Sequence, residues 1–132
     1  MRVMIIQGAR IEKNYIVEAS KGELEMNDKI SMLELGKKLD QLSEDELVLD
    51  VRSPEEYRDG HVPGSINIPH EEVEKHVNEL KDYKHVYIHC KMGGRAKTAF
   101  EKLQKLGLKN LVCVAGSGMK DWIEAGLKIA KS

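Results

Sequence analysis

Short apolar segments alternate with amphipathic helical segments along most of this chain, and this alternation constrains the fold more than any other feature. The segments 46–51, 85–89 and 110–114 are apolar runs of the kind that form buried strands. Helical patterns lie between them, and the clearest one carries an apolar stripe from Ala96 to Leu106. The order predicts an α/β protein with a largely parallel central sheet and helices on both of its faces.

Two capping boxes mark the starts of further helices. Ser31 and Glu34 have the spacing of one box, and Ser53 and Glu56 have the spacing of a second, with Pro54 at the first helical position. The other predicted elements are helices over 31–42, 69–80 and 118–125 and a short strand over 65–68.

The regular pattern begins at Lys29, so the sequence divides into two parts. Residues 1–28 hold two short β-leaning pieces, 3–6 and 15–17, without a helical stripe, and we expect an N-terminal extension there. Residues 29–132 have the length of a single domain, and we expect one α/β domain.

Charge balance and cysteine content exclude several classes of protein. The 21 Lys and Arg residues against 22 Asp and Glu give a net charge of −1, which argues against nucleic-acid and polybasic membrane binding. No apolar run is long enough for a membrane span or a secretory signal, so we expect a cytoplasmic protein.

The two cysteines, Cys90 and Cys113, are too few for a disulfide framework or a four-thiolate zinc site. Cys113 lies inside an apolar strand and is expected in the core.

The segment that follows the predicted strand 85–89 has the features of an anion-binding loop. Cys90 is its first residue, Gly93 and Gly94 allow the backbone amides to turn inward, and a helix with a positive N-terminal end follows. The stretch 83–100 contains no Asp or Glu, although it contains the cations Lys84, Lys91, Arg95 and Lys97. These features favour a thiolate, so the sequence predicts a nucleophile at Cys90.

Three segments resemble the signatures of the single-domain rhodaneses. The segment 49–65 resembles the first signature of that family, 90–96 its active-site loop, and 117–126 its closing motif. The resemblance extends over residues 29–132 and implies a rhodanese-like three-layer fold. Ser117 stands where the family usually has glycine, and we expect it to act as a helix N-cap.

The resemblance implies a sulfurtransferase that works through a persulfide on Cys90. A small anionic donor such as thiosulfate would supply the sulfur, and cyanide or a thiol would accept it. The family requires no metal or organic cofactor for this reaction. A sulfur-relay protein is a further candidate partner, and the expected state is a monomer or a homodimer. The residues implied in substrate binding are Lys91, Met92, Gly93, Gly94 and Arg95, with Lys91 and Arg95 holding the donor anion.

Two other functions stay open at this point. A sulfur carrier or protein-interaction module without free turnover would use the same loop. A phosphatase or arsenate reductase is the third alternative, but related enzymes of that kind have five residues between cysteine and arginine. Only four residues separate Cys90 from Arg95 here.

Four other polar residues are interpreted as mainly structural. Asp50 is expected to accept hydrogen bonds from amides near the loop, and Arg52 to pair with a carboxylate such as Glu56. His61 is expected to stabilise a turn, and His89 to point to the face of the strand opposite Cys90.

Overall fold

The computed structural model describes residues 28–132, and it centres on a sheet of five parallel strands. The expected extension therefore lies outside the described residues, apart from Asp28. The spatial order of the strands is β1-β5-β4-β2-β3. Along the chain they are β1 (Asp28–Ile30), β2 (Glu46–Asp50), β3 (Ile66–Asn67), β4 (His85–His89) and β5 (Leu111–Val114).

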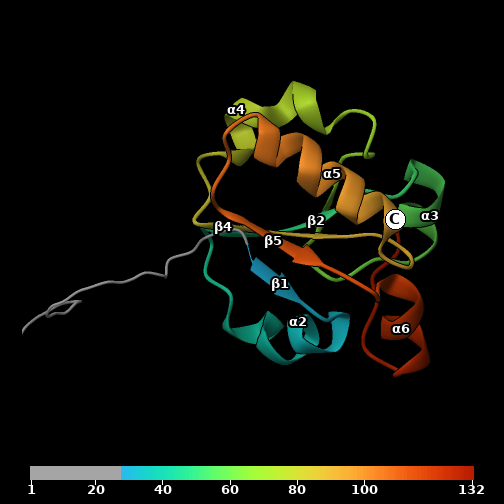
Figure 1. The fold of residues 1–132 in the computed structure, drawn as a ribbon. Helices are drawn as coiled ribbons and strands as arrows, with labels where there is room; N and C mark the ends of the chain where they lie inside the picture. Colours follow the sequence, from blue (N-terminus) through green and yellow to red (C-terminus); the bar gives the residue numbers. More distant parts are fainter. Residues whose placement is uncertain (1–27) are drawn as a thin grey trace, which may run out of the picture.

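Helices cover both faces of the sheet and make a three-layer α/β fold, as predicted (Figure 1). One layer contains α4 and α5, and the layer on the opposite face contains α2 and α6 (Figure 1). No helix within residues 28–132 is long and apolar enough to cross a membrane. The helices are α2 (Met32–Lys38), α3 (Pro54–Asp59), α4 (Val77–Leu80), α5 (Gly94–Lys105) and α6 (Met119–Glu124), with 3-10 turns η1 (Leu39–Gln41) and η2 (Val73–His76).

Alternation along β4 decides which layer each of its side chains enters. Val86, Ile88 and Cys90 are buried in the core beneath α5, whereas Tyr87 is buried in the core beneath α2 and α6. Because successive side chains of a strand point to opposite faces, His89 lies on the face opposite Cys90, as predicted. The same alternation places Cys113 in the core beneath α5, where it is 2% exposed.

Both predicted capping boxes are present. The Ser31 and Ser53 hydroxyls accept from the amides of Glu34 and Glu56, whose carboxylates accept from the serine amides in return. These caps fix where α2 and α3 begin.

The helix predicted over 69–80 is wrong in its first two thirds. The amide of His70 donates to Val51 beside the sheet, and the amides of Glu72 and Lys75 donate to carbonyls three residues back. The segment therefore starts as tight turns, and α-helix begins only at Val77. The strand β1 was not predicted, because its three residues, 28–30, include a single apolar side chain.

Candidate active site

The sulfur atom of Cys90 lies inside a loop that joins β4 to α5. The amide of Gly93 donates to Cys90 Sγ at 3.1 Å, and the amide of Ala96 donates at 3.3 Å. The residue is only 1% exposed, so the loop encloses the thiol. Gly93 has a φ of 118°, a left-handed conformation that favours glycine, and it forms the N-cap of α5.

The first turn of α6 forms hydrogen bonds with this loop. The amide of Met119 donates to the carbonyl of Cys90 at 2.8 Å, and that of Lys120 donates to the carbonyl of Lys91 at 3.1 Å. A Cβ at Gly118 would lie 2.3 Å from the Cys90 carbonyl oxygen, so this approach requires glycine. These bonds satisfy the first two loop carbonyls and fix the loop against α6.

Four more loop amides have no acceptor among residues 28–132, namely those of Lys91, Met92, Gly94 and Arg95. Backbone amides gathered in one loop form a cradle for an anion, and the N-terminal end of α5 adds positive potential. The loop is therefore built to hold negative charge on, or next to, Cys90 Sγ.

Arg95 is bound by Glu56 of α3 rather than left free. Its two terminal nitrogens donate to the two Glu56 oxygens at 2.7 and 3.0 Å. The hydrogen bond from Arg95 lowers the pKa of Glu56 from 4.5 to about 2. In this geometry Arg95 ties the loop to α3, and direct contact between Arg95 and a donor stays a prediction.

Lys91 is the loop cation without an ionic partner. It is exposed and forms no ion pair within the described part of the chain. Its neighbour Met92 is 63% exposed at the tip of the loop. Lys91 and Met92 are therefore the loop side chains that an incoming molecule meets.

Asp50 and Arg52 pair with each other beneath the site. Arg52 Nη2 donates to Asp50 Oδ2 at 2.7 Å and to the Gly60 carbonyl at 2.8 Å, and both charged groups are buried. Arg52 therefore pairs with a carboxylate, as expected, but the partner is Asp50 and not Glu56, because Asp50 lies only two residues away at the end of β2. Asp50 accepts its hydrogen bonds from Arg52, not from the loop around Cys90.

His89 is fully buried next to this pair, with Nε2 4.0 Å from Asp50 Oδ2. Burial lowers the pKa of His89, which favours the neutral ring at pH 7. His61 has the turn-stabilising position expected of it: Nδ1 lies 2.7 Å from the Tyr57 carbonyl, and the ring stacks on Tyr57.

Ser117 is not the N-cap of α6, contrary to expectation. Gly118 occupies the N-cap of α6, while Ser117 Oγ accepts from the amide of Met32 at 2.9 Å. The hydroxyl thus connects the loop before α6 to the start of α2.

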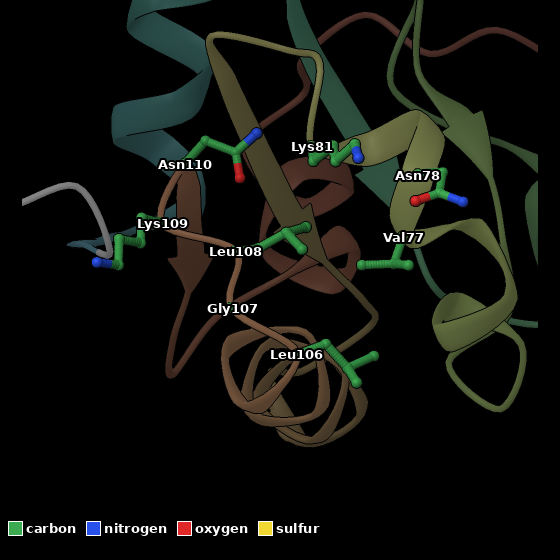
Figure 2. A pocket seen from close by; sticks show the side chains of 8 residues that line it. All are labelled: Val77, Asn78, Lys81, Leu106, Gly107, Leu108, Lys109 and Asn110. Atoms are coloured by element: carbon green, nitrogen blue, oxygen red, sulfur yellow. The ribbon is translucent and has the colours of Figure 1, made fainter.

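Two pockets were not foreseen from the sequence. A groove of about 320 Å³ lies between α3 and α6 and reaches Lys91, next to Cys90. A second pocket of about 520 Å³ lies at the opposite edge of the sheet, between α4 and the segment that connects α5 to β5 (Figure 2). In that pocket Val77, Leu106 and Leu108 point toward one another (Figure 2). Within residues 28–132 no group of three or more His, Cys, Asp or Glu side chains is placed to hold a metal ion.

The fold and the loop define a three-layer α/β protein with a buried cysteine whose sulfur accepts from two amides of the loop between β4 and α5. The family model for the rhodanese-like domain matches residues 32–125, and the chain belongs to this family. The relatives include sulfurtransferases and a protein named as a sulfur carrier.

Among curated relatives, "Putative sulfur carrier protein YrkF" of Bacillus subtilis is 44% identical over 75 residues, covering 57% of this chain and 40% of that protein. The uncharacterized protein YqhL of the same organism is 35% identical over 75 residues and is covered to 59% of its length. This chain therefore spans less than two thirds of either relative. Thiosulfate sulfurtransferase PspE of Escherichia coli is 35% identical over 75 residues, covering 55% of this chain and 70% of PspE.

The fold is also similar to solved structures. A rhodanese-related protein from Thermoplasma volcanium is 34% identical, with a TM-score of 0.67 over 80% of this chain and 99% of that one. A thiosulfate sulfurtransferase from Pseudomonas aeruginosa is 25% identical, with a TM-score of 0.69 over 80% of this chain and 20% of that one.

Proposed function

We propose that this protein transfers sulfane sulfur from an anionic donor of the thiosulfate type to a thiol or cyanide, through a persulfide on Cys90. The observation that carries the proposal is the loop around Cys90 Sγ. Two amides already donate to the sulfur, and four others in the loop lack an acceptor among residues 28–132. This arrangement suits both a thiolate and the terminal sulfur of a persulfide.

The donor half-reaction needs no redox partner. The Cys90 thiolate attacks the outer sulfur of thiosulfate, the sulfur–sulfur bond of the donor breaks, and its electron pair leaves with sulfite. The loop amides hold the transferred sulfur, and Lys91 attracts the donor anion. The proposed reaction uses no metal or organic cofactor.

In this proposal Arg95 is a positioning residue. Its bonds to Glu56 fix the end of the loop against α3, where the amide of Ala96 donates to the sulfur. The donor anion then meets Lys91 first, because the Arg95 guanidinium is already engaged.

A sulfur carrier loaded by another protein is the second candidate, favoured by the name of the relative YrkF. It would form the same persulfide and differ only in its slow turnover with small acceptors. A phosphatase is disfavoured, since only four residues separate Cys90 from Arg95, and the related phosphatases have five at this place.

Intact-mass measurement tests the proposal. Incubation with thiosulfate is expected to add one sulfur atom to the protein, cyanide to remove it, and Cys90→Ser to abolish the gain. Steady-state turnover with cyanide then separates an enzyme from a carrier. Absence of any adduct with several sulfane donors would overturn the proposal.

A further inference from the structure

The groove between α3 and α6 begins where the active-site loop begins. Its volume is about 320 Å³, and its walls include Lys91 of the loop and Asp59 of α3. Met119 and Ile123 of α6 supply apolar surface, and Ile123 is 53% exposed. The groove can therefore bind the non-reacting part of a molecule that delivers or removes sulfur at Cys90.

Most charges in this groove are already paired. Arg52 binds Asp50, Glu56 binds Arg95, and Lys120 binds Glu124 at 2.8 Å. Lys91 and Asp59, both exposed, form no ion pair with any residue from 28 to 132. The groove thus presents one cation, from the loop, and one anion, from α3, to a ligand.

We propose that the groove selects the sulfur acceptor, and that this acceptor is a small zwitterionic thiol of the amino-acid type. Its carboxylate pairs with Lys91, its ammonium with Asp59, and its carbon chain lies on Met119 and Ile123. This inference rests on the proposed function, because it assigns the acceptor for the same persulfide. Lys91 serves both half-reactions in turn, since sulfite leaves before the acceptor enters.

The acceptor step balances without another reactant. The thiolate of the acceptor attacks the outer sulfur of the Cys90 persulfide, and a new sulfur–sulfur bond forms. The bond between Cys90 Sγ and the outer sulfur breaks, and its electron pair returns to Cys90 as the thiolate. The proton on the outer sulfur leaves with the product persulfide.

Single-turnover transfer from persulfide-loaded protein tests the assignment with four acceptors. Cysteine and cysteamine carry an ammonium group, whereas mercaptopropionate and mercaptoethanol do not. Asp59→Asn is expected to lower the second-order rate constant about fivefold for the first two thiols, to leave that of mercaptoethanol unchanged and not to lower that of mercaptopropionate, since its carboxylate gains from the loss of a negative charge. Comparing each thiol with itself across variants removes differences in thiol reactivity.

The matched control is Asp82→Asn, which removes the same charge from an exposed residue that precedes β4 at the other edge of the sheet. It is expected to change none of the four rate constants. S-methylcysteine, which has both charges but no free thiol, is expected to compete with cysteine in wild type and about fivefold less well in Asp59→Asn.

Equal effects of Asp59→Asn on all four thiols, or no effect on any, would overturn the inference while leaving the persulfide chemistry intact. Failure of wild type to take up sulfur from any donor would instead overturn the proposed function, and the acceptor assignment with it.

Discussion

Arg95 and Glu56 form a bidentate ion pair that joins the end of the Cys90 loop to α3. Its two hydrogen bonds, from the Arg95 terminal nitrogens to the Glu56 carboxylate oxygens, are 2.7 and 3.0 Å long. Glu56 is also the third residue of α3 and the acidic member of its capping box, so one carboxylate serves both the helix and the loop. The arginine assigned to donor binding from the sequence is thus held by a carboxylate of α3 in this structure.

The variant Glu56→Gln tests the structural role of this ion pair. The variant is expected to lose about 1–2 kcal/mol of unfolding free energy at pH 7, because a bidentate charged pair becomes a single neutral contact. Sulfur uptake is also expected to slow. Urea unfolding measures the first effect, with Glu55→Gln as the control at an exposed neighbour. Equal stability of the two variants would contradict the role of the pair.

The same pair predicts a pH dependence. Pairing with Arg95 lowers the pKa of Glu56 from 4.5 to about 2. The contribution of the pair to the free energy of unfolding is therefore fully present above pH 4.5 and is lost as the pH falls toward 2. The stability difference between wild type and Glu56→Gln is expected to shrink over that interval. A difference that stays constant from pH 7 to pH 2.5 would show that the ion pair is not its cause.

Gly118→Ala tests how α6 supports the loop. The added methyl carbon would lie 2.3 Å from the Cys90 carbonyl oxygen, so either the loop or the helix must move. We expect a loss of about 1–3 kcal/mol in stability and at least a tenfold slower uptake of sulfur from thiosulfate. Gly60→Ala is the control, since its methyl carbon would meet only the Ile129 side chain, at 3.3 Å. If Gly118→Ala took up sulfur from thiosulfate at the wild-type rate, the proposed support of the Cys90 loop by α6 would be refuted.

Lys91→Gln tests how the donor anion is attracted. The KM for thiosulfate is expected to rise about threefold to tenfold at low salt, and the difference is expected to shrink at high salt. Lys84→Gln makes the same charge change at the other end of β4 and is expected to leave KM unchanged. If both variants had the same KM as wild type, Lys91 would have no part in donor binding.

The sequence was sufficient for those parts of the fold that follow from local patterns. The strands β2, β4 and β5, the capping boxes and the placement of Cys90 and Cys113 all follow from apolar runs and turn signals within a few residues. The short strand β1 and the turns before α4 depend on bonds to distant segments, and the local pattern does not contain that information.

Side-chain partners were the least predictable part of the site. Arg52 had three carboxylates within four residues, namely Asp50, Glu55 and Glu56, and only the strand-end geometry selects Asp50. Glu56 pairs with Arg95 across 39 residues of sequence. The Ser117 hydroxyl likewise binds the amide of Met32, 85 residues away. The groove between α3 and α6 was missed because its walls come from three separate segments.

The most direct test of the persulfide is to locate transferred sulfur on a residue. Wild-type protein is incubated with thiosulfate labelled at the outer sulfur, digested without reductant, and analysed by mass spectrometry. The label is expected on the peptide that contains Cys90 and is expected to disappear after cyanide treatment. Label on the Cys113 peptide, or on neither peptide, would contradict sulfur transfer through Cys90.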